Sequence, residues 1–228
     1  MPVPLRTPLC DELGIDVPIL SAGMGSIAGA DLVAAVSEAG GFGVLGVSGV
    51  SPEVVRTRID STRALTKRPF GVNVIIDEIG WAASEEDREL VHAEVASAID
   101  EQVTAVVLFW GDPAPFVELA HRKGVLLLVQ VGSLAEAATA AAADVDAIIA
   151  QGVEAGGHVR GTSFSQSDLR RMGCRRTPAT GTSSRRRDDH RHIAPAVGQD
   201  CRCAAVCGSG LAGGRLRRRP RLPGHVGR

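Results

Sequence analysis

Residues 105 to 131 of the chain read AVVLFWGDPAPFVELAHRKGVLLLVQV. Two short apolar runs, Ala105–Phe109 and Val125–Val131, flank a segment that begins with Asp112 and Pro113 and has the pattern of a helix. Asp before Pro favours a helix start, because the Asp side chain caps free amides and Pro fits the first turn. Strands that are apolar on both faces are typical of parallel sheets. The stretch therefore predicts a strand, a helix and a second, parallel strand.

The same unit recurs along the chain, about every 25 residues. Further strands are expected at Pro18–Ala22, Phe42–Leu45, Phe70–Ile75 and Ala147–Ala150. Further helices are expected at Ala30–Ala39, Pro52–Thr66, Ser84–Ile99 and Leu134–Ala143. An eight-fold (β/α) barrel typically needs about 250 residues, and six units fit before residue 162. The expected fold class is α/β, of the (β/α)8 TIM-barrel type, with six βα units recognisable and the last two missing or disrupted.

The distribution of charge divides the chain at residue 162. Residues 1–162 carry 10 Lys and Arg against 22 Asp and Glu, whereas residues 163–228 carry 15 Arg against 4 Asp. The tail has scattered apolar residues with no period of a strand or a helix, so it is expected to be poorly ordered. Arg without Lys, mixed with Gly, Pro, Ala and Cys, also resembles a GC-rich coding region read in the wrong frame. Sequencing the transcript or the locus would test that hypothesis.

Two other interpretations of the tail were weighed. Its Arg runs could bind nucleic acid by neutralising phosphates, although it lacks helical periodicity and has Phe164 as its one aromatic residue. A metal site formed by its His and Cys residues is not expected, because the Cys201-x-Cys203-x3-Cys207 spacing is not a regular zinc spacing. No N-terminal signal and no apolar run long enough for a membrane span are visible. A cytoplasmic protein is the default expectation.

A glycine-rich turn follows the strand expected at Ala147–Ala150. It reads QGVEAGGH from Gln151 to His158. Gly156 and Gly157 have no Cβ, so the backbone there can adopt positive φ and approach a ligand closely. A histidine where a strand passes into a loop can change its charge near neutral pH. This turn is the first candidate for a functional site.

Other polar or glycine residues fall at or near the ends of the expected strands. In a β/α barrel the loops after the strands face the active site. Asn73, Gln130 and Gln151 interrupt or end apolar runs, and buried amides need partners. Gly23 and Met24 lie in a glycine-containing turn after the first expected strand. Together these residues predict a polar rim around a flat ligand, although any one amide alone is more often structural.

The order of four elements identifies a resemblance. They are PILSAGM at 18–24, GGFGVLG at 40–46, FGVN at 70–73 and QGVEAGGH at 151–158. In this order they resemble the nitronate monooxygenase family, formerly called 2-nitropropane dioxygenases, over about residues 8–162. The resemblance implies an FMN-binding (β/α) barrel portion over residues 1–162. It also implies a flavoprotein that oxidises alkyl nitronates or nitroalkanes with O2 to a carbonyl compound and nitrite.

The resemblance assigns roles to individual residues. His158 matches the catalytic histidine that takes a proton from a nitroalkane carbon, a task suited to a base with a pKa near working pH. The residues expected at the cofactor are Gly23, Met24, Asn73, Gln130, Gln151, Gly156 and Gly157. No metal is expected. A flavin-dependent enoyl-acyl-carrier reductase, which has a similar Glu-Ala-Gly-Gly-His element, is the alternative within the superfamily. The two strands and loops that hold the FMN phosphate in the family have no match after Gly161.

Overall fold

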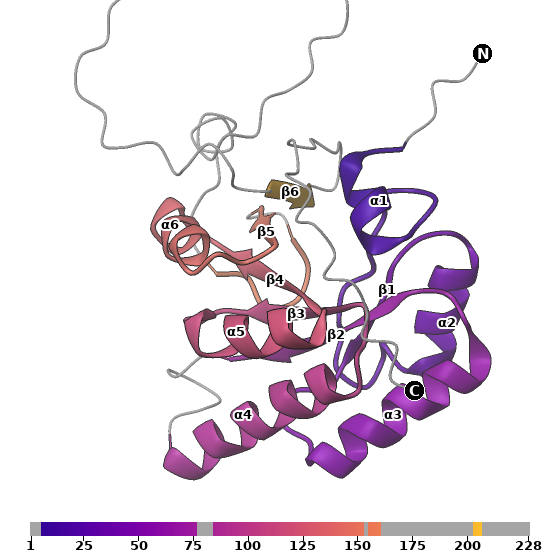
Figure 1. Ribbon diagram of the computed structural model, residues 1–228, viewed down its shortest axis with the longest axis horizontal. Coiled ribbons are helices and arrows are strands. Elements are labelled where there is room, and N and C mark those ends of the chain that lie inside the picture. The colour runs from indigo at the N-terminus through magenta and orange to yellow at the C-terminus, as the bar shows by residue number, and fades with distance from the viewer. Residues whose placement is uncertain (1–5, 77–83, 153–154, 161–202, 207–228) are drawn as a thin grey trace, which may run out of the picture.

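The computed structural model describes residues 6–76, 84–152, 155–160 and 203–206 of the 228-residue chain (Figure 1). In these residues six parallel strands form one sheet in the order β1-β2-β3-β4-β5-β6. The strands are β1 Gly43–Gly46, β2 Phe70–Ile75, β3 Ala105–Phe109, β4 Leu126–Val131, β5 Ala147–Gln151 and β6 Cys203–Val206. The helices are α1 Pro8–Leu13, α2 Ala30–Glu38, α3 Pro52–Leu65, α4 Glu85–Asp100, α5 Ala114–Lys123 and α6 Leu134–Ala142.

The strands bury side chains on both faces, as the apolar runs predict. One cluster joins the helices α2 to α6 to alternate strand residues such as Val72, Val106 and Leu127. A second cluster joins α1 to the intervening residues, among them Val107, Leu128 and Ile149. In Figure 1, α2 to α6 follow the outside of the curved sheet, and α1 lies apart from them near β1. This is the arrangement of a β/α barrel wall, with α1 packed on the inner face.

The local signals in the sequence explain where the helices begin and end. The Ser84 side chain accepts a hydrogen bond from the Asp87 amide at the start of α4, and Ser133 accepts one from Glu136 at the start of α6. Gly124, at φ 71°, ends α5 in the left-handed conformation that favours glycine. All five expected helices are present, with bounds within one residue of those predicted.

The first expected strand, Pro18–Ala22, is wrong: only Leu20 makes a bridge, to Phe42. Pro18 has no amide hydrogen to donate. The Val44 amide donates to the side chain of Ser21, at 3.0 Å, instead of to a backbone carbonyl. The hydroxyl thereby replaces a ladder bond and pairing stops after one bridge. The sheet therefore begins at β1 in the described residues.

Two elements were not predicted. Helix α1 follows Thr7 and Pro8, a start signal that the sequence analysis did not use. The tail was expected to contain no strand, but β6 pairs in parallel with β5, Ile148 facing Cys203 and Gln151 facing Val206. A sheet edge presents unpaired amides and carbonyls, so even a four-residue run can pair with it. The remaining tail residues, including the Arg runs, lie outside the described residues.

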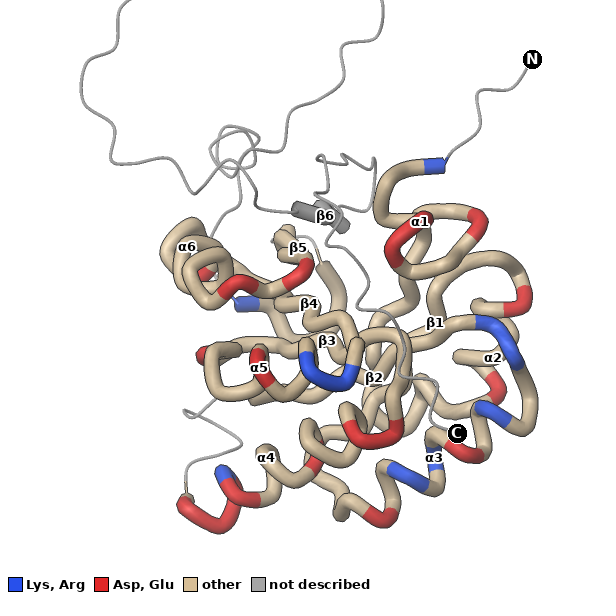
Figure 2. The backbone as a smooth tube through the Cα atoms, in the orientation of Figure 1, with Lys and Arg blue, Asp and Glu red and all other residues tan. Residues whose placement is uncertain are grey.

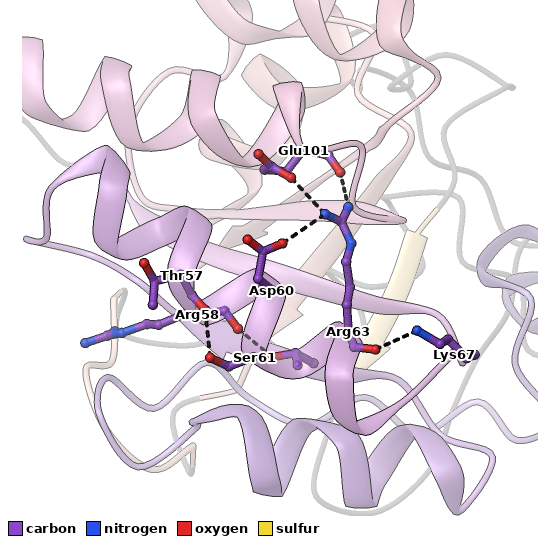
Figure 3. A network of polar contacts seen from close by, with 8 residues as sticks. Thr57, Arg58, Asp60, Ser61, Arg63, Lys67 and Glu101 are labelled. Carbon is purple, nitrogen blue, oxygen red and sulfur yellow. Dashed lines mark hydrogen bonds and ion pairs between the residues drawn. The ribbon is translucent and has the colours of Figure 1, made fainter.

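Charges are concentrated on the helices and loops, and strands β1 to β5 contain none (Figure 2). One group connects α3 with the end of α4: the Arg63 guanidinium lies 2.8 Å from the Glu101 carboxylate and 3.7 Å from that of Asp60 (Figure 3). The Lys67 ammonium group donates to the Arg63 carbonyl at 3.0 Å. Most of these side chains are well exposed, so they contribute little to the stability of the fold.

Candidate functional site

Three strands place an amide side chain at or near their carboxyl ends, on the inner side of the sheet. Asn73 pairs with Val107, and Gln130 and Gln151 each lie two residues after a member of the inner cluster. Because side chains alternate along a strand, all three occupy inward positions. The Asn73 amide nitrogen donates to the Val107 carbonyl at 2.9 Å. The three amides therefore share the inner face of the sheet, and the polar rim around a ligand stays a prediction.

The amide of Gln151 holds the turn that carries His158. Its nitrogen donates to the His158 carbonyl at 2.8 Å, and its oxygen accepts the Arg160 amide at 2.9 Å. Gln151 is only 5% exposed. The nitrogen and the oxygen of the Gln151 amide are thus both hydrogen-bonded to the backbone, one at His158 and the other at Arg160. The side chain expected at the cofactor here fixes the histidine turn.

An indole ring adjoins the histidine. Trp110 follows β3 directly, and its ring centroid lies 5.8 Å from that of His158 with an edge-on angle of 85°. The guanidinium carbon of Arg160 lies 5.7 Å from the Trp110 ring centroid. Trp110 has φ 62°, an uncommon conformation for a bulky residue, and its buried indole nitrogen has no hydrogen-bond partner. Such unsatisfied and strained groups cluster at functional sites.

The glycines of the site differ in what surrounds them. A Cβ atom at Gly156 or Gly157 would have no atom within 4 Å, and Gly157 has φ 76°. Both glycines are exposed, so this part of the turn faces open space. Gly23, in contrast, packs directly against the Asn73 side chain, which leaves no room for a Cβ atom at residue 23. Contact within the protein, without a ligand, is therefore enough to account for a glycine at this position. Met24 is 44% exposed, next to Gly25, whose backbone lies against Gly46 at the end of β1.

A buried carboxyl group supports the loop after β1. Glu94 of α4 is fully buried and its Oε1 accepts the Val50 amide at 2.7 Å, while Oε2 has no partner. Burial raises the pKa of Glu94 to about 7, and backbone hydrogen bonds from Val50 and Gly49 oppose the rise. The next contact along this loop is the Ser48 hydroxyl, which accepts the Ile75 amide at 2.8 Å. The loop is therefore attached to both α4 and β2.

Sequence reasoning missed Trp110, Glu94, Glu136 and Arg160. Trp110 had a usable signal, since it follows a strand at the edge where barrel sites lie. Glu136 lies in the first turn of α6, and its carboxylate oxygen accepts from the Arg160 side chain at 2.6 Å. Strands β3 and β4 lie between the Gly23–Asn73 pair and the His158 turn.

A hollow of about 570 Å³ lies at the opposite end of the strands. Its walls include Arg63, Lys67 and Arg68 and the residues that precede β2 and β3. None of the predicted site residues lines it. No group of three or more candidate metal ligands is present in the described ranges. Of the tail His and Cys residues considered for a metal site, only Cys203 lies within those ranges. No helix in those ranges is long and apolar enough to cross a membrane.

Comparison with known proteins gives related sequences and a related structure. The chain is 35% identical over 175 residues to the nitronate monooxygenase of Paraburkholderia phytofirmans, covering 64% of this chain and 48% of that protein. It is 34% identical over 154 residues to a Mycobacterium tuberculosis enzyme named (3aS,4S,5R,7aS)-5-hydroxy-7a-methyl-1-oxo-octahydro-1H-indene-4-carboxyl-CoA dehydrogenase, covering 68% of this chain and 41% of that one. The structure of FabK from Thermotoga maritima matches with a TM-score of 0.61 and 35% identity, over 69% of this chain and 48% of FabK.

The matched region of the chain covers 48% of the Paraburkholderia phytofirmans protein and 41% of the Mycobacterium tuberculosis protein, so the chain spans about half of these relatives or less. The model of the family described as nitronate monooxygenase matches residues 6–173, which include every element from α1 to β5 and the His158 turn. The structural match confirms the α/β fold of the barrel type. On the strength of these matches, the chain belongs to the nitronate monooxygenase family.

Proposed function

We propose that this chain binds FMN and oxidises alkyl nitronates with O2, giving a carbonyl compound and nitrite. The single observation that carries the proposal is the position of His158 at the carboxyl edge of the sheet. Its turn is fixed by Gln151, its ring contacts Trp110, and open space adjoins Gly156 and Gly157. Membership of the family supports the same reaction.

The residues of the site fit a flavin in three respects. A flat ring can approach a backbone that has no Cβ atoms, as at Gly156 and Gly157. The inward amide of Gln130 and the indole nitrogen of Trp110 can donate hydrogen bonds to ring oxygens and nitrogens. Met24 supplies apolar surface that is still exposed. The match to the family model ends at residue 173, so it does not extend to β6.

When bound, FMN supplies the redox chemistry of the reaction. The part of His158 is to accept a proton at an imidazole nitrogen when the substrate arrives as a neutral nitroalkane. Gln151 holds the His158 backbone, so the ring is presented from a fixed turn. Trp110 packs against the edge of the imidazole and limits the directions from which a substrate can reach it.

The test is an absorbance spectrum of the purified full chain after incubation with FMN and gel filtration. A retained flavin spectrum, together with O2 uptake on addition of an alkyl nitronate, would support the proposal. The matched variant His158→Asn should keep the spectrum and lose turnover of the neutral nitroalkane. A soluble chain that stays colourless in the presence of excess FMN would refute the proposal.

A second candidate is a flavin-dependent reductase or dehydrogenase of acyl thioesters, the class to which the enoyl-acyl-carrier reductase belongs. It is favoured by the relative whose name describes a carboxyl-CoA substrate. Such an enzyme would oxidise NADH in the presence of an enoyl thioester, or oxidise an acyl-CoA, without consuming a nitronate. Parallel assays of O2 uptake with a nitronate and NADH oxidation with an enoyl thioester separate the two candidates.

A further inference from the structure

We propose that Glu136 is a positioning residue, which holds the His158 turn in place through Arg160. The inference rests on the proposed function for the role of His158, but the contacts that carry it do not. Glu136 and Arg160 are 24 residues apart in sequence and come from different parts of the sheet edge, the start of α6 and the turn after β5. Neither residue belongs to the family motif at residues 151–158.

Both oxygens of the Glu136 carboxylate accept a hydrogen bond. Oε1 accepts from the Nε of Arg160 at 2.6 Å, and Oε2 accepts the Gly132 amide at 2.7 Å. The backbone amide of Glu136 in turn donates to the Ser133 hydroxyl at 3.2 Å. The carboxylate also lies in the first turn of α6, where the helix dipole favours negative charge. Glu136 is therefore a fixed point rather than a mobile surface group.

Arg160 connects that fixed point to the histidine turn. Its side chain is 32% exposed and that of Glu136 is 29% exposed, so the ion pair is partly shielded from water. The guanidinium group also lies over the Trp110 ring, which contacts His158 edge-on. The Arg160 amide donates to Gln151. The side chain of Arg160 thus spans from Glu136 to Trp110 while its backbone is held by the same amide that holds His158.

The charge and the geometry make Glu136→Gln a sharp test. A glutamine at this position has one acceptor oxygen and one donor nitrogen, but it faces two donors, the Arg160 Nε and the Gly132 amide. The charge is therefore lost, and the two contacts can no longer each have an oxygen of their own. The link from Arg160 to α6 is then either lost or reduced to a neutral hydrogen bond, while the turn keeps the two hydrogen bonds of Gln151.

The matched control is Glu118→Gln. Glu118 also pairs with an arginine, Arg122, at 2.5 Å, but both side chains are well exposed on α5. This variant loses the same charge and the same kind of ion pair without touching the site. A second test variant, Arg160→Gln, removes the other partner of the proposed attachment.

The experiment is amide hydrogen exchange of the peptide that contains residues 155–160, with kcat and KM measured on the same full-length proteins. In Glu136→Gln and in Arg160→Gln we expect exchange in this peptide to accelerate roughly tenfold, with no change in Glu118→Gln. The acceleration in the double variant should be smaller than the two single effects combined, because both variants remove the shared Glu136–Arg160 interaction. In an active chain kcat should fall several-fold in the two test variants, while the KM for the nitronate changes little.

Each result bears on the inference. Unchanged exchange in Glu136→Gln, or additive acceleration in the double variant, would overturn it. Faster exchange with an unchanged kcat would overturn the role in positioning His158. If the wild-type chain bound no flavin and showed no turnover, while exchange accelerated as expected, the attachment would stand and the proposed function would fall.

Discussion

A Cβ atom built on Gly23 would lie 2.4 Å from the Cβ atom of Asn73. The loop before α2 thus passes directly over the polar residue in the middle of β2. Asn73 cannot move away without losing its hydrogen bond to the Val107 carbonyl. Gly23 is therefore required by its neighbour, whether or not a ligand is bound.

For Gly23→Ala we expect a loss of about 1–3 kcal/mol in the free energy of unfolding, because an added methyl group must displace a packed side chain. Gly29→Ala is the matched control, since a Cβ there meets only the Ser26 carbonyl at an ordinary 3.7 Å. Chemical denaturation of both variants measures the difference. Equal stability of the two would contradict the steric explanation.

Gly156→Ala should behave in the opposite way. A Cβ atom at Gly156 meets no atom within 4 Å, so the free energy of unfolding should change by less than about 1 kcal/mol. If a flavin lies against this glycine, its dissociation constant should rise by roughly tenfold or more, because the methyl group occupies the contact surface. Fluorescence titration with FMN provides the measurement, and unchanged affinity would place the ring elsewhere.

His158→Asn should lower the rate of nitroalkane deprotonation by about 10²–10⁴-fold, the usual contribution of a general base. The turn should survive, because Gln151 bonds the backbone carbonyl of residue 158 and not its side chain. Stopped-flow reduction of the bound flavin by a neutral nitroalkane measures the rate. A rate within threefold of wild type would remove His158 from the role of base.

Glu94 should make the stability of the chain depend on pH. Burial raises the pKa of Glu94 from 4.5 to about 7, so the folded state holds a proton that the unfolded state releases between these values. The free energy of unfolding should therefore fall as pH rises from about 4.5 to 7, by at most about 3 kcal/mol from this group. Above pH 7 the contribution should level off.

The test of this dependence is Glu94→Gln, which should flatten the slope between pH 4.5 and 7. The exposed Glu89 on the same helix provides the control, and Glu89→Gln should leave the slope as it is. Denaturant midpoints measured across this range give the comparison. A slope that persists in Glu94→Gln would assign the pH dependence to another group.

Much of the fold follows from the sequence, because continuous apolar runs and capping residues are local signals. The runs at 70–75 and 105–109 become β2 and β3 with the predicted bounds. The run at 18–22 failed because a single side chain, Ser21, takes the amide that a strand would need. No hydropathy pattern contains that information.

In the candidate site, too, some residues have a local signal in the sequence and others do not. His158 and Gln151 could be found because both lie in one short motif, and Asn73 because a polar residue interrupts an apolar strand. The ion pair of Glu136 with Arg160 could not, since the fold alone brings together residues 24 positions apart. Trp110 meets His158 for the same reason, through the parallel order of β3, β4 and β5.

The inner cluster has a consequence for the order in which the chain can fold. Helix α1 is synthesised before the sheet, yet Cys10 and Leu13 are buried together with residues of β3, β4 and β5, which follow about 90 to 140 positions later. Until those strands leave the ribosome, the apolar face of α1 can pack only against nearby members of the cluster such as Phe42 and Val44. A chain arrested before β5 would expose this face and offer a binding site to chaperones. Helix α1 thus precedes these strands in synthesis but completes its native contacts only after them.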